Sequence, residues 1–365
     1  MLFATSQGTA AGCSMTTSGV VFDAHNHVHL SMPNGVPPIG SLNSDRNDEI
    51  YRSHADNIVN CFHSRDRQSA EAAHHLTGGG DERDNDAKTN MPLSFHVRGI
   101  GLMSTQPRDF PAVSAICNVL CGVEGGDSSD EGGVMTDQFH AIPCFGVHPW
   151  FLHEAEADGA HVADSRSTAS FWWEKDLRHA LSSHPNAAVG EIGLDAIRYD
   201  PSTGELCTPM ERQKEAFELQ IRIATEMQRT VSVHAVQAWG PMMDILNTKL
   251  GKKKGDKPPC IYFHAFGGKA SVVDQLNAAC RPAKVYYGFA PFANFRSPKT
   301  ADVARKIGID RLVLETDYEN YLDVRQQLEL NVLFLAKALD MDPLEVMKTT
   351  RMNAMHLYGT QTNQR

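Results

Sequence analysis

Two histidines one residue apart, His25 and His27, follow the apolar run at residues 19 to 24. Side chains on a β-strand alternate between its two faces, so both imidazoles would project on one side, roughly 6 to 7 Å apart along the strand. Both rings can therefore reach a single metal ion. His29 continues the alternation but lies farther out. For His29, exposure to solvent or packing in a loop is favoured over metal binding.

Other apolar runs also end in residues that bind metal ions in proteins. These are Glu191 in Gly-Glu-Ile-Gly-Leu-Asp, His148 in Gly-Val-His-Pro, His234 ending Val-Ser-Val-His, His264 ending Tyr-Phe-His, and Asp317 ending Leu-Glu-Thr-Asp. One such residue alone is more often a hydrogen-bonded side chain at a strand end. Six stretches with the same placement are hard to explain in that way, and together they could supply a two-metal site. The pattern indicates a metallohydrolase.

The residue types also indicate which ions and which reaction to expect. Histidine and carboxylate ligands suit zinc, manganese or another first-row ion, whereas magnesium prefers more oxygen ligands. Two ions about 3.5 to 4 Å apart can share a hydroxide, lower its pKa and stabilise the attacking and leaving oxygens. Asp317 could bind metal and also orient or deprotonate that nucleophile. Asp195 and Glu315 are candidates for fixing the orientation of the ligands.

His148 differs from the other candidates because a proline follows it. Pro149 restricts the conformation of the loop, which favours His148 as a contact to a substrate phosphate. A structural hydrogen bond would explain the same residue equally well.

The elements that must position these residues follow from alternating strand-like and amphipathic runs, a pattern typical of parallel β/α units. Eight strands are predicted, at 20–25, 96–103, 141–147, 187–192, 230–234, 260–264, 284–289 and 311–316. Helices are predicted at 170–183, 209–228, 322–339 and 343–357, the last capped by Asp342 before Pro343. We therefore expect an α/β fold, a (β/α)8 TIM barrel with long loop insertions. Every candidate lies at or just beyond the carboxyl end of a strand, where barrel enzymes place their sites.

The predicted domain organisation is a single TIM-barrel hydrolase domain at 20–358, with insertions at about 31–95 and 122–137. Residues 1–19 form a flexible amino-terminal segment and 359–365 a tail. In the first insertion we expect a helix near 48–75 and a mobile segment to about 91. The Gly-, Ser- and acid-rich stretch 125–133 predicts an exposed loop, and the three lysines at 252–254 predict a solvated turn rather than a polyanion site.

Composition narrows the classes of function. The 365 residues are 41% hydrophobic and 21% charged, as in ordinary folded proteins. With 44 acidic against 34 basic residues, the chain offers no broad basic surface for nucleic acid, so a nuclease must rely on a local site. The eight cysteines lack a Cys-x-x-Cys pair and predict reduced thiols. No secretory signal or membrane-length apolar run is evident, so we expect an intracellular protein, cytoplasmic or nuclear, without membrane contact.

The order His-x-His, Gly-x-His-Pro, Gly-Glu-Ile-Gly-Leu-Asp, His, His and Glu-Thr-Asp resembles the TatD family of metal-dependent deoxyribonucleases, part of the amidohydrolase superfamily. The resemblance runs from about residue 20 to 358. It implies a barrel with two divalent ions (zinc, manganese or magnesium) and hydrolysis of phosphodiester bonds, typically of DNA from an end. It implies this ligand set: His25, His27 and Asp317 on the first ion, His234 and His264 on the second, and Glu191 between them.

Two departures from the family pattern concern the substrate. Usual members carry His-x-Arg after the fifth strand, where this chain has His234-Ala235-Val236. The usual Glu-Thr-Asp-x-Pro is replaced by Glu-Thr-Asp-Tyr-Glu, in which Glu319 adds a negative charge. The motif forms are closer to a divergent eukaryotic branch, which includes a fungal protein named for interaction with a cell-cycle complex component.

Three hypotheses for function remain at this point. The favoured one is a metal-dependent phosphodiesterase or deoxyribonuclease that uses a metal-activated water, with DNA or another phosphodiester as substrate. The second is hydrolysis of another ester or an amide on the same metal site. The third is a barrel retained as a protein-interaction module, but its signature would be a broken ligand set, and here all six positions are filled. The sequence leaves open the metal, DNA versus RNA or a small phosphoester, and the oligomeric state.

Overall fold

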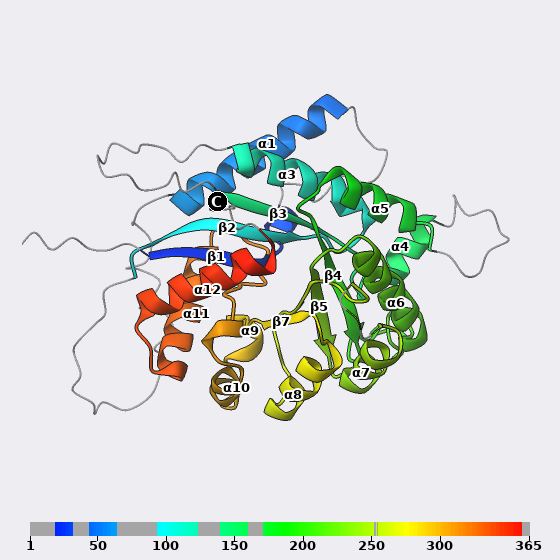
Figure 1. Cartoon of the computed structure of the whole chain (residues 1–365). Coiled ribbons are helices and arrows are strands. Elements are labelled where there is room, and N and C mark those ends of the chain that lie inside the picture. Colours follow the sequence, from blue (N-terminus) through cyan, green and yellow to red (C-terminus); the bar gives the residue numbers. More distant parts are fainter. Residues whose placement is uncertain are drawn as a thin grey trace, which may run out of the picture.

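Seven parallel strands form one curled sheet in which each strand pairs with the next along the chain (Figure 1). They are β1 (Gly19–Asn26), β2 (Phe95–Met103), β3 (His140–Phe145), β4 (Ala188–Asp195), β5 (Val231–Val236), β6 (Cys260–Phe263) and β7 (Lys284–Tyr287). The computed structural model describes residues 19–31, 44–63, 93–122, 139–159, 171–251, 253 and 255–359. Seven of the eight predicted strands thus correspond to strands of the sheet.

The eighth predicted strand, at 311–316, is not a ladder strand. Its single bridge joins Leu312 to Tyr287 of β7, where Val313 N donates to Tyr287 O (3.0 Å). On its other side Leu314 O accepts from the backbone of β1. Regular pairing stops because Thr316 N donates to the Asp23 carboxylate (3.0 Å) instead of to a strand carbonyl. The observed fold is therefore a curled sheet of seven strands. An extended segment lies between β7 and β1 in place of an eighth strand.

Helices surround the outside of the sheet (Figure 1). They are α1 (Ser44–His63), α3 (Phe110–Gly122), α4 (Leu152–Gly159), α5 (Glu174–Ser183), α6 (Met210–Glu226), α7 (Trp239–Thr248), α8 (Ala270–Ala279), α9 (Pro291–Asn294), α10 (Thr300–Ile307), α11 (Val324–Leu339) and α12 (Pro343–Leu357), with short 3-10 turns at Val28–Ser31, Pro107–Asp109 and Ile309–Arg311. The four predicted helices are α5, α6, α11 and α12. The predicted cap is confirmed, because Asp342 accepts from Leu344 N at 2.8 Å.

The apolar residues pack in two layers. One cluster lies between the sheet and the helices, and its largest fully buried side chain is Trp173. The other joins alternate residues of the strands, such as Phe22, Met103 and Tyr262, with Val313 of the extended segment and the end of α12. Since strand residues alternate between faces, this second cluster fills the inner face of the curl, as in barrel enzymes.

Several expectations fall partly or wholly outside the described residues. The first predicted insertion contains α1, which begins at Ser44, earlier than expected. The predicted mobile segment to 91, the 125–133 loop, residues 1–18 and the tail after Gly359 lie outside the described residues. Of the three lysines, Lys253 is described, and its exposed backbone turn is closed by a bond from Lys253 N to Asp256 (3.1 Å), as predicted.

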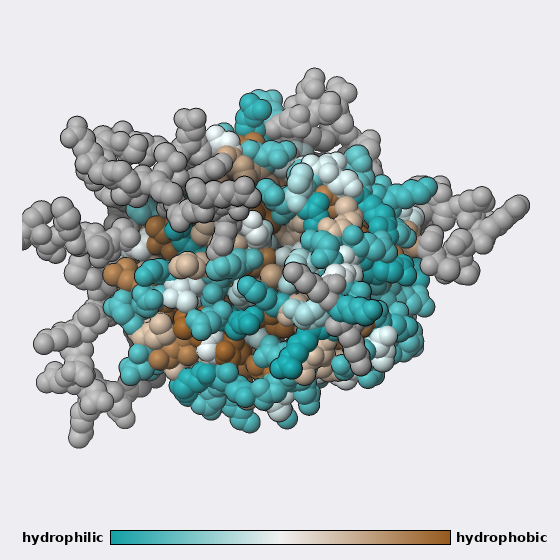
Figure 2. Space-filling view, in the orientation of Figure 1, coloured by the Kyte–Doolittle hydropathy of each residue, from teal (hydrophilic) through white to brown (hydrophobic). Residues whose placement is uncertain are grey.

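The surface is mostly hydrophilic over α6 and α7 and more hydrophobic over the region of α9 and α11 (Figure 2). Exposed leucines of α11 are Leu330 and Leu333. None of the helices in the described part of the chain has the length and apolarity that a membrane crossing needs. The cysteines of these segments are all free thiols, as predicted.

Candidate metal centre

The candidate residues meet at one end of the sheet. His25 and His27 lie at the end of β1, Glu191 in β4, His234 in β5, His264 directly after β6, His148 after β3, and Asp317 at the end of the extended segment. Because the strands are parallel, their carboxyl ends share one edge, and the loops beyond them surround a common mouth. The sequence therefore placed together residues that the structure also brings together.

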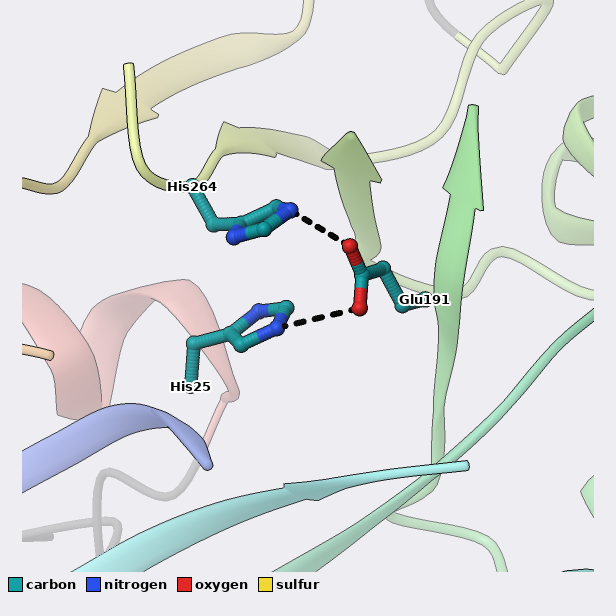
Figure 3. A group of neighbouring side chains, drawn as sticks. All are labelled: His25, Glu191 and His264. Carbon is teal, nitrogen blue, oxygen red and sulfur yellow. Dashed lines mark ion pairs between the residues drawn. The ribbon is translucent and has the colours of Figure 1, made fainter. Parts of the chain in front are cut away.

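Glu191 divides the histidines into two groups, one at each carboxylate oxygen. In Figure 3 one oxygen points toward His25 and the other toward His264, whose rings lie face to face with centroids 3.8 Å apart. Oε2 lies 3.3 Å from His25 Nε2 and 3.0 Å from His27 Nε2. Asp317 Oδ1 completes this first group, at 3.5 Å from each of the same two nitrogens.

The other oxygen, Glu191 Oε1, faces three imidazoles. It lies 2.6 Å from His264 Nε2, 3.0 Å from His234 Nδ1 and 3.1 Å from His148 Nε2. Glu191 itself is buried, with 3% of its surface exposed. A buried carboxylate with ring nitrogens on both oxygens has the form of a ligand shared by two ions.

Hydrogen bonds behind the rings fix which nitrogen faces the centre. His27 Nδ1 lies 3.2 Å from the carbonyl oxygen of Met103, so in the neutral ring this nitrogen carries the proton and Nε2 offers a lone pair. His234 Nε2 lies 2.9 Å from Asp195 Oδ2, so in the neutral ring Nδ1 offers the lone pair to the centre. This carboxylate–histidine arrangement is typical behind metal ligands.

His148 has the opposite tautomer. The backbone N–H of Trp150 donates to His148 Nδ1 (3.1 Å), so in the neutral ring the proton sits on Nε2, which then donates to Glu191 Oε1. Burial lowers the pKa of His148 to about 4, and the nearby Glu191 only partly offsets this effect. His148 is thus a neutral hydrogen-bond donor in the centre. This state fits a contact to an anionic oxygen, although His148 also lies with Glu191 and His234 in a group of side chains that could hold an ion.

Asp195 holds other groups in place besides the His234 ring. Its Oδ2 also accepts from Trp150 Nε1 (2.7 Å), and its Oδ1 accepts from the backbone N–H groups of Ile197 and Arg198 (2.7 and 2.9 Å). Burial raises the pKa of Asp195, but the bonds to His234 and to the Ile197 backbone outweigh it and lower the pKa to about 2. The charged carboxylate ties the loop after β4 to the centre.

Glu315, a candidate for fixing the orientation of the ligands, bonds to no histidine ring in the described part of the chain. Its carboxyl group accepts from Ala265 N (2.6 Å) and contacts the Tyr262 hydroxyl, so it holds the backbone beside His264 rather than the ring itself. Burial raises the pKa of Glu315 well above its usual value, and the neighbouring Asp317 adds to the effect. A side chain at Gly288 would come within 2.6 Å of this carboxyl group, so the glycine leaves the space it occupies.

The electrostatics of the centre fit divalent cations. Burial lowers the pKa of His27, but hydrogen bonds to Asp317 and Glu191 raise it to about 10, and Asp195 and Glu191 raise the pKa of buried His234 to about 9. Burial raises the pKa of Glu191, but the surrounding histidines hold it well below its usual value. The centre therefore attracts positive charge. His264 Nδ1 is buried without a hydrogen-bond partner among the described residues, and the donor set of imidazoles and carboxylates suits first-row ions.

Sequence reasoning missed three supporting residues. Asp23 is fully buried and accepts from Thr316 Oγ1 (2.7 Å) and Asn26 Nδ2 (2.8 Å), which joins β1 to the segment carrying Asp317. Ser232 Oγ lies 3.0 Å from His25 Nδ1, and Trp150 contacts Asp195. Each is next to a motif: Asp23 begins Asp-Ala-His, Ser232 is on the same strand face as His234, and Trp150 follows Gly-Val-His-Pro.

His29 lies outside this centre. It is fully buried, with Nε2 3.7 Å from Asp109 Oδ2, and does not face solvent. Of the two roles favoured for it, packing against the loop after β2 is the one observed.

A cavity of about 390 Å³ opens beside Asp317. Its other lining residues are Phe292, Tyr318, Glu319, Asn320 and Asp323. Phe292 and Tyr318 form an edge-on pair with centroids 6.1 Å apart, and Glu319 supplies the extra negative charge expected near the mouth. This side of the mouth is aromatic and acidic.

A curled parallel sheet with an imidazole and carboxylate centre at its carboxyl edge defines a class, the metal-dependent hydrolases on barrel-like folds. The chain belongs to the family described as TatD related DNase, whose family model matches residues 22–359. The family predicted from the motifs is therefore confirmed, and with it the expectation of a hydrolase that acts on ester bonds.

Individual relatives agree with the predicted eukaryotic branch. Cut9-interacting protein scn1 of Schizosaccharomyces pombe is 27% identical over 261 residues, with 54% of this chain and 78% of that protein covered. Deoxyribonuclease TATDN3 of Homo sapiens is 27% identical over 229 residues, with 60% of this chain and 74% of that protein covered. A solved structure of a TatD family hydrolase from Entamoeba histolytica has a TM-score of 0.53 at 15% identity, covers 73% of this chain and 86% of that one, and shows the fold.

Proposed function

We propose that this chain is a two-metal-dependent phosphodiesterase that cleaves nucleic acid, with DNA as the leading substrate. The observation that carries the proposal is the division of ligands between the two oxygens of Glu191. One carboxylate that faces two separate groups of ring nitrogens is suited to hold two ions next to each other. The human relative named as a deoxyribonuclease supports nucleic acid as the substrate class.

Two sets of residues would hold the ions. His25, His27 and Asp317 would hold the first with Glu191 Oε2. His234 Nδ1 and His264 Nε2 would hold the second with Glu191 Oε1. When bound, zinc or manganese ions supply a lowered pKa for a water molecule and positive charge for the phosphate. Magnesium fits this histidine-rich set less well.

The protein's own groups would then act on the proton and the substrate. Asp317 is largely buried, and His25 and His27 lie within 3.5 Å of its Oδ1; its carboxylate would accept the proton of the attacking water. His148 would donate a hydrogen bond from Nε2 to a phosphate oxygen. Asp195 holds His234, and Glu315 holds the backbone beside His264, so both act through the ligands.

We also propose that the sheet closes into a barrel. The extended segment at 312–317 donates to β7 and accepts from β1, and Val313 joins the inner apolar cluster. We infer that it completes a (β/α)8 barrel, and that residues 20–358 form one hydrolase domain with insertions at about 31–95 and 122–137. Such closure would bring Asp317 to the same histidines, His25 and His27, that Glu191 Oε2 contacts.

The test combines metal analysis with hydrolysis of end-labelled single- and double-stranded DNA, RNA and a small phosphodiester. Wild type should hold up to two divalent ions and cleave a nucleic acid. Replacing Asp317 with Asn keeps its size but removes the charge, and turnover should fall about 100- to 10,000-fold while circular dichroism is unchanged. Asp310→Asn, an exposed carboxylate before the same segment, is the control. A metal-loaded wild type that cleaves esters or amides but no phosphodiester would overturn the proposal, and one with no hydrolytic activity would favour the interaction module.

A further inference from the structure

Arg198 is an exposed cation beside the metal centre whose charge is unpaired within the described segments. Its guanidinium carbon lies 5.0 Å from the centre of the Trp150 ring, a stacked cation–π arrangement. No hydrogen bond or ion pair joins this guanidinium to another described residue. Asp200, two residues later, is already bonded to the backbone N–H and hydroxyl of Ser202 (2.7 and 2.6 Å). The guanidinium is therefore available to an external anion.

Trp150 connects Arg198 to the centre. The indole ring stands edge-on to His148 and His234, with centroids 5.1 and 5.7 Å away. Its Nε1 donates to Asp195 Oδ2 (2.7 Å), which fixes the plane of the ring. A guanidinium stacked on this ring is thus held beside two residues of the centre.

The backbone of Arg198 is fixed as well. Arg198 N donates to Asp195 Oδ1 (2.9 Å), and Arg198 O accepts from Cys207 N (2.9 Å). Both ends of the residue are anchored although its side chain is exposed. Less conformational freedom is lost when such a side chain binds a ligand.

Charge around the mouth favours this position for an anion. The chain carries a formal net charge of −10, and the cavity beside Asp317 is lined by Asp317, Glu319 and Asp323. At the end of β5, Ala235 and Val236 offer no cation. A phosphate strand crossing the mouth would meet repulsion on the acidic side and attraction beside Arg198.

We propose that Arg198, stacked on Trp150, binds the phosphate next to the one held at the metal centre. The proposal rests on the proposed function. The Trp150 ring contacts both the guanidinium of Arg198 and His234 of the centre. Hydrogen bonds reach only about 3 Å, so one phosphate would not contact both. The guanidinium and the centre would therefore hold different phosphates of one strand. The planar guanidinium can donate to two oxygens of one phosphate. Arg198 would therefore act on strands and not on a substrate with a single phosphodiester.

The kinetic test compares two substrates of the metal-loaded enzyme, a ten-nucleotide single strand and bis(p-nitrophenyl) phosphate. Arg198→Ala should raise KM for the strand about ten-fold and leave kcat, and hydrolysis of the small diester, unchanged. Arg198→Lys should recover part of the loss, since it keeps the charge but not the planar fork. Arg222→Ala, which removes the same charge near the far end of α6, is the matched control.

A binding test separates this inference from the proposed function. Fluorescence anisotropy of the labelled strand, measured on the inactive Asp317→Asn background, should show weaker binding for Arg198→Ala and a slope of log affinity against log salt that is smaller by about one. For the Asp317→Asn protein that keeps Arg198, the slope of log affinity against log salt should itself be shallow. Equal binding by both proteins, or an equal loss with Arg222→Ala, would overturn the role of Arg198 even if wild type cleaves DNA. Weaker binding specific to Arg198→Ala would support it even if wild type cleaves no phosphodiester.

Discussion

The two groups of side chains around Glu191 differ in charge. The group at Oε2 contains a second carboxylate, Asp317, beside His25 and His27. The group at Oε1 contains only imidazoles. Around Oε1 the nearest further carboxylates are each one ring away: Asp195 lies 2.9 Å from His234 Nε2, and Asp317 Oδ2 lies 3.9 Å from His264 Nδ1. An ion at the first position would meet two negative charges directly, and an ion at the second would meet one.

This difference in charge predicts that two ions sharing Glu191 would occupy unequal positions. Direct carboxylates raise the affinity for a cation more than imidazoles alone, while a carboxylate behind an imidazole makes the ring a better donor. We therefore expect two-step loading, with the Asp317 position filled first. Asp195 would be the residue that most strengthens the binding of an ion at the second position.

The supports behind the rings differ too. His27 and His25 rest on Met103 O and Ser232 Oγ, both neutral groups. His234 rests on a charged carboxylate. The position with less charge in direct contact has the stronger support behind its ligand, which is the arrangement expected if both positions must be occupied for turnover.

The largest expected effect comes from Glu191→Ala, because both groups lose their common ligand. Bound metal should fall from up to two ions to none or traces, and turnover should fall by more than about 1,000-fold. The thermal stabilisation that manganese or zinc gives the wild type should also disappear, since ions that bind only the folded form stabilise it by mass action. Elemental analysis and thermal shift measure this. Glu226→Ala, an exposed carboxylate on α6, should behave as wild type, and a Glu191→Ala protein that keeps one tightly bound ion would show that Glu191 is not shared.

A smaller effect, confined to one position, is expected for Asp195→Asn. The amide nitrogen cannot accept the proton of His234 Nε2, so the ring would lose its fixed tautomer. Affinity for the second ion should fall about 10- to 100-fold, and the first should bind as before. Calorimetric titration of the metal-free protein resolves the two steps. Asp200→Asn removes the same charge from the neighbouring loop and should change neither step; equal weakening of both steps by Asp195→Asn would remove the distinction between the two groups.

Much of this fold and centre could be predicted from the sequence because the signals are local. Apolar runs bounded by turns predict seven strands, and the histidines and carboxylates at their ends predict which side chains meet at the mouth. The eighth predicted strand forms only a single bridge to β7, for a physical reason. Its run is as apolar as the others, but Thr316 N bonds to Asp23, a residue 293 positions away. No local pattern carries that contact.

Local patterns also leave the state of each ring open. Which nitrogen of His27 faces the centre depends on Met103 O, and which nitrogen of His234 does so depends on Asp195. The sequence suggests that Glu315 orients the ligands, but it does not show that Glu315 bonds to Ala265 and Tyr262 beside His264 and not to a ring. Spacing predicts that residues meet, but hydrogen bonds formed after folding decide what each one can do.

The smallest expected effect, and the sharpest test of the Oε1 group, is His148→Gln. Sequence alone left His148 between a phosphate contact and a structural bond, and the Trp150 N–H donor on Nδ1 makes it a donor rather than a ligand. The glutamine amide can still donate, so turnover should fall only about ten-fold, with two ions bound at unchanged affinity. Metal titration beside nuclease turnover measures both quantities, and His153→Gln, an exposed histidine on α4, is the control. If the variant loses the second ion, His148 is a ligand, and the Oε1 group has three imidazoles on its metal instead of two.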